Sequence, residues 1–524
     1  MRHGFVKAAA GTPDIRVGDC AYNASRIWDM MQQADALGAR ILVLPELCLT
    51  GYTCSDLFLH DALLLSAERE LSGIVERSAK LDMLTVIGVP LLYRSKLYNC
   101  AAVLHAGKLL GVVPKSHLPN YGEFYELRQF TPAPKEMGEI HIGTHTAPFG
   151  VRQLFRCSTM QELCVGIEIC EDLWVPVPPS SSLAREGATV ILNPSASDET
   201  IGKDEYRRLL VKSQSGRLCC AYLYSDAGHG ESTTDLVYSG HNLIAENGAI
   251  LTENEPFETE PALAVSEIDC RRLLHERRRL TTYTFDREAG QPPYTVTEFA
   301  LQVRDTSLTR EISPTPFIPQ DIRDRNARCE DILRIQANGL RKRIEHTRCK
   351  TAVVGVSGGL DSTLALLVAA RAMQLAGRSA ADVLAVTMPC FGTTHRTRSN
   401  AERLCDCLGI PCKTVDITTA VLQHFRDIGH PEDKLDTTFE NGQARKRTQV
   451  LMDIANQTGG IVIGTGDLSE LALGYATYNG DHMSMYAVNA SVPKTLIRHI
   501  VRYLADTSET DALDRKSTRL NSSH

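Results

Sequence analysis

The sequence predicts an α/β fold with two domains, an α-β-β-α sandwich followed by a doubly wound parallel sheet. Short apolar segments alternate with amphipathic stretches along both halves of the chain, which is the pattern of strands and helices in layered α/β proteins. The 524 residues exceed what a single hydrophobic core usually organises. A polar stretch with several prolines between the two halves predicts a linker.

Apolar runs in the first half predict strands, and hairpins are expected at Ala106-Gly107 and Asn247-Gly248 because such pairs suit tight turns. An amphipathic helix is predicted at 24–37. Hairpins among helices indicate two mixed sheets in a sandwich. The predicted strands are 6–10, 41–44, 84–89, 100–104, 109–113, 163–169, 190–192 and 219–224.

The second half predicts strands joined by helices in the manner of a parallel, Rossmann-like sheet. Its strands are predicted at 352–356, 383–387, 414–417 and 461–463, and its helices at 361–374 and 443–456. The expected domains are 1–275, a linker at 276–325, and 326–515. The polar, aperiodic residues 516–524 are interpreted as a non-native tail.

Composition excludes several function classes. The formal net charge of −7 disfavours non-specific binding to nucleic acid. No stretch approaches the ~20 apolar residues that a membrane span needs, and no signal peptide is recognisable. The 16 cysteines lack the spacing of a disulfide scaffold and are interpreted as reduced thiols. A cytoplasmic enzyme acting on small molecules is expected.

Three polar residues stand at the ends of apolar strands in the first half: Glu46 in LVLPELCLTGY, Lys115 in GVVPKSHLPNYGEFYE and Cys170 in VGIEICEDLW. A cysteine that attacks an amide carbonyl needs a base and a positive group for the developing charge, and these three residues supply that set. Each also has a structural explanation. Cys170 would be a small buried hydrophobe, Glu46 a helix cap and Lys115 a solvated strand end.

A glycine loop in the second half, Ser357-Gly358-Gly359-Leu360-Asp361-Ser362, joins a strand to a helix. Such a loop lets backbone N–H groups surround a phosphate at a helix N-terminus. The lysine of ordinary P-loops is absent. Asp361 and Glu470 are hard oxygen ligands suited to a divalent cation, although Asp467 and Thr465 near Glu470 are equally typical helix caps.

The segments around Glu46, Lys115 and Cys170 resemble the nitrilase superfamily, with its catalytic Glu-Lys-Cys. Within it, LPELCLTGY, PKSHLPNYGEFYE and EICEDLW resemble the amide-hydrolysing domain of glutamine-dependent NAD synthetases. The resemblance implies that Glu123 is the supporting second glutamate. It also implies glutamine-binding residues at Tyr121, Glu171 and Ser197.

The S-G-G-x-D-S loop resembles the pyrophosphatase-loop ATP enzymes, and GTGDLSELALGYAT resembles the same NAD synthetase family. The resemblance runs from residue 1 to about residue 507. It implies ATP binding at Ser357, Gly358, Gly359, Leu360, Asp361, Ser362 and Thr465, and Mg²⁺ at Asp361 and Glu470. It also implies binding of deamidated NAD at Asn441, Arg445, Asp481 and Lys494, although the basic run 445–447 is also compatible with a solvated helix face.

The implied reaction uses ATP to adenylate the nicotinate carboxylate of nicotinate adenine dinucleotide, and ammonia from glutamine then displaces AMP to give NAD. A homo-oligomer and an enclosed ammonia passage are also implied. The family's chain continues past VPKTLIRHIVRYLADT into a lysine-bearing loop, so a shortened synthetase half is expected.

Three rival interpretations remain open. In the first, only the glutaminase half is active, and the second half serves as a binding or oligomerising module. A free-standing nitrilase would leave the glycine loop without a role. Other amidotransferases that carry such a loop use a different glutaminase fold, and this sequence has no catalytic cysteine directly after Met1.

Overall fold

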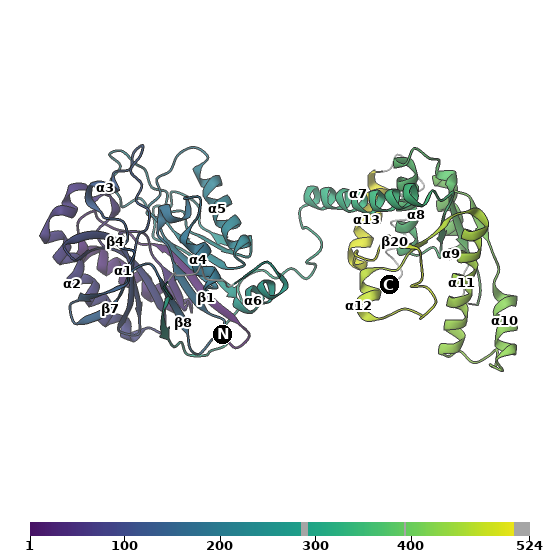
Figure 1. The fold of residues 1–524 in the computed structure, drawn as a ribbon, viewed down its shortest axis with the longest axis horizontal. Coiled ribbons are helices and arrows are strands. Elements are labelled where there is room, and N and C mark those ends of the chain that lie inside the picture. Colours follow the sequence, from purple (N-terminus) through teal and green to yellow (C-terminus); the bar gives the residue numbers. More distant parts are fainter. Residues whose placement is uncertain (285–291, 392–394, 508–524) are drawn as a thin grey trace. The chain divides into compact units, whose positions relative to one another are not determined.

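The chain forms two compact units, Met1–Glu311 and a second unit that begins at Ile312 (Figure 1). The computed structural model describes residues 1–284, 292–391 and 395–507. In the third of these segments it describes side chains only from residue 400 onward. The predicted tail, 516–524, lies outside the described residues, as do residues 508–515. Among the described helices, none combines the length and the apolar character required to cross a membrane.

The first unit contains two mixed β-sheets. The larger sheet has the strand order β14-β1-β2-β3-β4-β5-β7-β6. Its strands are β1 (Phe5–Thr12), β2 (Ile41–Val43), β3 (Leu84–Tyr93), β4 (Lys96–His105), β5 (Lys108–Pro114), β6 (Gly138–Ile142), β7 (His145–Phe149) and β14 (Ala262–Asp269). The other sheet has the order β13-β12-β11-β10-β9-β8-β15. Its strands are β8 (Gln153–Cys157), β9 (Cys164–Ile167), β10 (Val190–Pro194), β11 (Ala221–Ser225), β12 (Leu243–Glu246), β13 (Ala249–Glu253) and β15 (Thr295–Phe299).

Four layers of secondary structure make up this unit. The two sheets share an apolar core to which Val86 of β3 and Val190 of β10 both belong. Helices α1 (Cys20–Ala36) and α2 (Asp61–Arg77) cover the outer face of the larger sheet. Helices α4 (Pro179–Arg185) and α5 (Lys203–Arg217) cover the outer face of the other sheet (Figure 1). The shorter helices are α3 (Glu126–Gln129), α6 (Cys270–Arg279), η1 (Tyr52–Leu59), η2 (Ser78–Lys80) and η3 (Cys170–Leu173). The predicted α-β-β-α sandwich is confirmed.

Both predicted hairpins are present. Ala106 and Gly107 have positive φ angles of 47° and 79° between β4 and β5, and Asn247 and Gly248 have 47° and 85° between β12 and β13. Two consecutive left-handed residues give the turn a twist that matches that of its flanking strands.

The segment predicted as a linker, 276–325, differs from a linker over much of its length. It contains the end of α6, and β15 pairs in parallel with β8 from Thr295↔Gln153 to Phe299↔Cys157. Beyond β15, Thr309 and Arg310 donate hydrogen bonds to the buried carboxylate of Glu267. The chain leaves the first unit only after Glu311.

The second unit is a doubly wound parallel sheet, as predicted. Its strand order is β18-β17-β16-β19-β20, and all pairs are parallel. The strands are β16 (Ala352–Gly355), β17 (Val383–Thr387), β18 (Cys412–Thr414), β19 (Ile461–Gly464) and β20 (Tyr486–Ala487). The predicted strand 414–417 is wrong for its last three residues, because the pairing of β18 with β17 ends at Thr414↔Thr387.

Helices cover both faces of this sheet (Figure 1). One face packs on α7, α8, α9 and α13, and the other on α11 and α10. The helices are η4 (Ala380–Asp382), α7 (Ile322–Thr347), α8 (Leu360–Leu375), α9 (His395–Leu408), α10 (Thr418–Asp427), α11 (Thr437–Thr458), α12 (Leu468–Leu473) and α13 (Lys494–Thr507). The strand order reverses between β16 and β19, which is where open α/β sheets bind ligands.

Candidate functional site

The predicted triad of the first unit lies together in its interior. Glu46 follows β2, Lys115 follows β5, and Cys170 begins η3 after β9. All three are at least nine-tenths buried. Lys115 Nζ lies 2.6 Å from Glu46 Oε1, and the Cys170 thiol is within hydrogen-bonding reach of Glu46. The adjoining strand ends thus bring a nucleophile, a base and a cation to one point.

The second glutamate at Lys115 is Glu126 rather than the predicted Glu123. Glu126 Oε1 lies 2.6 Å from Lys115 Nζ and accepts a hydrogen bond of 2.8 Å from Tyr52 Oη. Glu123 is half-buried and, with Tyr52 and Glu126, lines a cavity of about 470 Å³. Both glutamates lie in the GEFYE stretch. Glu126, the first residue of α3, is buried, whereas Glu123 lies in the turn before that helix.

The electrostatics of the cluster follow from burial and charge. Burial raises the pKa of Glu46 above its usual value, against the opposing effect of Lys115, and this makes Glu46 a stronger base. Burial would lower the pKa of Lys115, but Glu126 and Glu46 outweigh it and hold the pKa well above its usual range. Burial raises the pKa of the Cys170 thiol. The lysine therefore stays charged while the thiol stays protonated until it reacts.

Two of the residues predicted to bind glutamine are in contact. Tyr121 Oη donates a hydrogen bond of 2.8 Å to Glu171 Oε1, directly after Cys170. The third, Ser197, is buried, and its N–H donates to Asp226 Oδ1 at 2.8 Å. The neighbouring Ala196 N–H donates to Glu46 Oε2 at 3.0 Å. The segment that contains Ser197 therefore also fixes the base.

One buried residue outside the predicted set of site residues connects two catalytic segments. Asp172 accepts hydrogen bonds from the N–H groups of Ile169 and His117, at 3.0 and 2.9 Å, and from His117 Nδ1 at 2.7 Å. It thereby ties the chain before Cys170 to the chain after Lys115. Asn193, in the NPSAS segment that contains Ser197, lies outside that set as well. Its Oδ1 accepts the N–H of Cys170 at 2.8 Å.

In the second unit, the glycine loop connects β16 to α8 as predicted. Gly358 has a φ of +82°, and Gly359 caps α8. Ser362 Oγ donates to Gly359 O at 3.1 Å, which closes the loop against the helix. Leu360 packs its side chain toward the core and can offer a ligand only its backbone. The loop's backbone surrounds the N-terminus of α8, where an anion is favoured.

Two cavities adjoin the loop. The larger, about 400 Å³, is lined by Ser357, Thr465, Arg447 and Asp481 among others. The smaller, about 180 Å³, is lined by Ser357, Asp361, Ser362, Thr465, Glu470 and Asp481 among others. Of the residues predicted to bind ATP, Ser357, Asp361, Ser362 and Thr465 thus face a common space at the strand reversal point.

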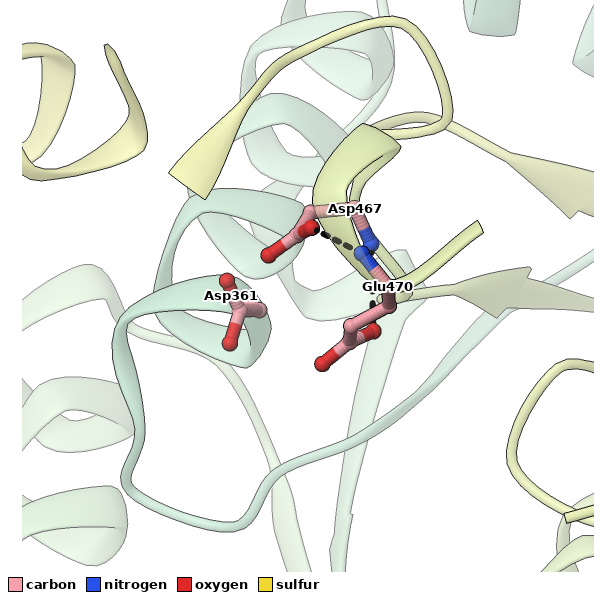
Figure 2. A group of neighbouring side chains, drawn as sticks. All are labelled: Asp361, Asp467 and Glu470. Carbon is pink, nitrogen blue, oxygen red and sulfur yellow. Dashed lines mark hydrogen bonds between the residues drawn. The ribbon is translucent and has the colours of Figure 1, made fainter. Parts of the chain in front are cut away.

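Three carboxylates converge beside this space. Ligand oxygens of Asp361, Asp467 and Glu470 lie within 4.8 Å of one another (Figure 2). Asp467 caps α12 through a 2.9 Å hydrogen bond from the Glu470 N–H, so its capping role and its place in the cluster coexist. Asp361 Oδ1 and Asp467 Oδ2 are buried and accept no hydrogen bond in the described part of the chain. Such hard oxygen donors fit a magnesium ion.

The predicted dinucleotide residues occupy two places. Lys494, at the start of α13, forms ion pairs with Asp361 and, at 3.4 Å, with Asp467, so it belongs to the carboxylate cluster. The other three hold the 477–481 loop. Asn441 accepts from Thr477 Oγ1 at 2.9 Å, Arg445 donates to Tyr478 O at 3.0 Å, and Asp481 accepts from the Thr477 N–H at 2.7 Å.

The carboxylates repel one another. Burial raises the pKa of Asp361 and of Glu470, and each neighbouring carboxylate adds to this effect. Burial would lower the pKa of Lys494, but Asp361 and the other acids raise it overall. A cation at this point therefore relieves the repulsion between the carboxylates, and in this structure that cation is the ammonium group of Lys494.

Comparisons with known proteins agree with this geometry. The carbon-nitrogen hydrolase family model matches residues 7–273, and the NAD synthase family model matches residues 332–510. The chain is 45% identical to a glutamine-dependent NAD(+) synthetase of Mycobacterium leprae, over 97% of this chain and 76% of that protein. It is 30% identical to one of Thermotoga maritima, over 93% and 78%.

A solved structure of a glutamine-dependent NAD(+) synthetase from Cytophaga hutchinsonii matches with 22% identity and a TM-score of 0.46, covering 99% of this chain and 83% of that one. The identities to the curated relatives and the two family matches decide the assignment. The chain belongs to the glutamine-dependent NAD(+) synthetases, with a carbon-nitrogen hydrolase domain followed by an NAD synthase domain.

Proposed function

We propose that this chain is a carbon-nitrogen ligase that makes NAD⁺, AMP, pyrophosphate and glutamate from nicotinate adenine dinucleotide, ATP and glutamine. One observation carries the proposal: a single chain holds a buried Glu-Lys-Cys cluster and a glycine loop beside three carboxylates. The alternative, in which only the glutaminase half works, is not favoured, because the NAD synthase family model matches residues 332–510.

In the first unit, the Cys170 sulfur attacks the side-chain carbonyl of glutamine while Glu46 takes the thiol proton. Lys115 stabilises the oxyanion that forms, held in place by Glu46 and Glu126. Glu46 then returns the proton to the departing ammonia, and a thioester remains. Water hydrolyses the thioester to glutamate, with Glu46 again as the base. Tyr121, Glu171 and Ser197 are proposed to hold the substrate's amino acid end.

In the second unit, the nicotinate carboxylate attacks the α-phosphorus of ATP, and pyrophosphate leaves. Ammonia then attacks the resulting acyl adenylate and expels AMP. Backbone N–H groups of the loop 357–362 are proposed to hold the phosphates. Asn441, Arg445 and Asp481 are proposed to contact the dinucleotide. Asp361, Asp467 and Glu470 would hold a magnesium ion, which when bound neutralises phosphate charge.

Ammonia must reach the second reaction as a neutral molecule, because amines of ordinary basicity are protonated near pH 7 and an ammonium ion has no free electron pair. Coupling glutamine hydrolysis to amidation within one enzyme meets this requirement. A cytoplasmic homo-oligomer remains part of the proposal. Sedimentation of the purified chain would test the oligomeric state.

The test compares the parent chain with Cys170→Ala, supplied with nicotinate adenine dinucleotide, ATP and Mg²⁺. Glutamine or ammonium serves as the nitrogen donor, and glutamate, AMP and NAD are measured. We expect the parent to use both donors and the variant to use ammonium alone. A variant that still hydrolyses glutamine would contradict the role of Cys170. A parent that hydrolyses glutamine but forms no AMP with either donor would contradict the synthetase assignment.

A further inference from the structure

The nucleophile of the first unit has an unusual backbone conformation. Cys170 has a φ of +44°, in the left-handed region that side chains other than glycine and asparagine rarely adopt. Its N–H donates a 2.8 Å hydrogen bond to the side-chain oxygen of Asn193 on the neighbouring strand β10. Strain of this kind persists only where the surroundings fix it, and the hydrogen bond to Asn193 is one of the contacts that hold the Cys170 backbone.

A buried chain of hydrogen bonds continues from Asn193 away from the active site. Asn193 Nδ2 donates to Tyr222 Oη at 2.8 Å, and Tyr222 Oη donates to Glu168 Oε1. Glu168 Oε2 accepts the N–H of Ser180 at 2.7 Å. Asn193, Tyr222, Glu168 and Ser180 are each at most 1% exposed. The chain crosses the adjacent strands β10 and β11 and ends on α4.

The direction of each hydrogen bond depends on the next. Glu168 in its ionised form can only accept, so Tyr222 must direct its single proton toward it. The Tyr222 oxygen is then an acceptor for Asn193, whose NH₂ group points to it. The Asn193 carbonyl oxygen therefore faces Cys170. The same oxygen also accepts from Ser195 Oγ at 2.8 Å. A carboxylate two residues before the nucleophile thus supports, through Tyr222, the orientation of the Asn193 amide that the Cys170 N–H requires.

We propose that Glu168, through Tyr222 and Asn193, acts as a positioning residue that holds Cys170 in its reactive orientation. The inference rests on the proposed glutaminase function of the first unit. The mechanism described above does not use Glu168, Tyr222 or Asn193, and none of them contacts the reacting atoms. Burial raises the pKa of Glu168 to about 7, against the lowering effect of the hydrogen bonds from Tyr222 and Ser180, so the carboxylate form that orients Tyr222 predominates above that pH.

The isosteric variant Glu168→Gln reverses this polarity. Ser180 offers Glu168 both its N–H and its hydroxyl, so the carbonyl oxygen of the introduced glutamine stays with Ser180 and its NH₂ group faces Tyr222. The Tyr222 proton must then point to Asn193 or stay buried without an acceptor. If Asn193 turns to accept it, an NH₂ group is placed against the Cys170 N–H. In either arrangement the support for Cys170 is lost or reversed.

The double variant Glu168→Gln/Asn193→Asp restores a consistent set of donors and acceptors. The aspartate accepts from both Cys170 N–H and Tyr222 Oη, and the new glutamine donates to Tyr222 while it accepts from Ser180. The total charge of the network is unchanged. Asn193→Asp alone places two carboxylates on one Tyr222 proton. Each single variant should therefore be worse than the double variant.

The experiment uses the full chain and measures kcat and KM for glutamine hydrolysis, with urea unfolding as a check on folding. It also measures the alkylation rate of Cys170 by iodoacetamide, followed by peptide mass spectrometry. We expect Glu168→Gln to lower kcat by about 10- to 100-fold, with KM changed by less than about threefold and a similar fall in alkylation. The double variant should recover at least about tenfold in kcat.

Glu267→Gln is the matched control. Glu267 is equally buried but bonds Lys7 and Thr309, away from the triad, and this variant should stay within about twofold of the parent. The inference would be overturned if the single variants had the same kcat as the control, or if the double variant were as slow as the single variants. A parent without glutaminase activity would refute the proposed function instead, and the alkylation rates would still decide whether Glu168 positions Cys170.

Discussion

Replacing Asp172 with asparagine tests whether one carboxylate holds two catalytic segments together. Asp172 is 1% exposed. Its Oδ1 accepts two hydrogen bonds from His117, and its Oδ2 accepts the N–H of Ile169 at 3.0 Å and, more weakly, that of Ser116 at 3.4 Å. The introduced asparagine could keep its oxygen toward His117. Its NH₂ group would then face two N–H donors and could accept from neither.

The expected cost follows from these contacts. A hydrogen bond to a charged group is worth about 1.5–3 kcal/mol, and a buried donor without an acceptor costs about 1–3 kcal/mol. Because the two terms overlap, we expect Asp172→Asn to lower the free energy of unfolding of the first unit by about 3 kcal/mol. It should also impair glutamine hydrolysis, since the segments that carry Lys115 and Cys170 lose their common attachment.

Urea unfolding followed by tryptophan fluorescence measures this cost, because both tryptophans, Trp28 and Trp174, lie in the first unit. Asp56→Asn is the control. Asp56 pairs with Arg128, and both side chains are more than half exposed, so solvent screens the pair and its loss should change the free energy of unfolding little. If Asp172→Asn costs no more than Asp56→Asn, the two segments are held by other contacts and the reasoning is wrong.

Three further predictions concern other parts of the two sites. The hydrogen bond to Asp172 raises the pKa of His117. His117 therefore stabilises the fold below its unfolded pKa of about 6.5, and this stabilisation is lost as pH rises through the raised pKa. Unfolding at several pH values should show a free energy of unfolding that falls with pH over this range, and His117→Gln should reduce that slope. A methyl group on Gly88 would lie 2.2 Å from the backbone nitrogen of Leu47, so Gly88→Ala should lower the free energy of unfolding by about 1–3 kcal/mol or more. It should also displace the neighbouring Glu46, and unfolding and glutaminase assays would measure the two effects. Lys494→Met removes the ammonium that competes for the acidic cluster, and calorimetry should show Mg²⁺ binding at least about threefold tighter; equal affinity would mean that Lys494 does not compete.

The layered architecture of both units was predictable because its strands are short apolar runs bounded by turn residues. Ala106-Gly107 and Asn247-Gly248 indicated their hairpins directly. The strand β15 was not predicted, since residues 295–299, Thr-Val-Thr-Glu-Phe, form no continuous apolar run and follow a polar stretch with two prolines. It becomes a strand because β8 offers hydrogen bonds and Phe299 enters the core. That stabilisation comes from residues distant in sequence.

The triad was predictable because Glu46, Lys115 and Cys170 each follow an apolar run whose end a sheet would present. Which of Glu123 and Glu126 contacts Lys115 was not predictable, because the two lie three residues apart in one segment and differ in burial, which the sequence does not reveal. The contact of Lys494 with the carboxylate cluster was not predictable for a related reason. Its partner Asp361 lies 133 residues away, and no local pattern connects a helix-start lysine to a phosphate loop.

The parallel pairing of β15 with β8 has a practical consequence for isolating the first unit. A chain ended at residue 275 would lose β15 and leave β8 as an open sheet edge, with unpaired backbone groups that invite association with other chains. It would also uncover the apolar surface that Phe299 and Leu301 now fill. A glutaminase unit that stays monodisperse should therefore extend through Arg310, whose guanidinium forms an ion pair with Glu246 at 3.0 Å.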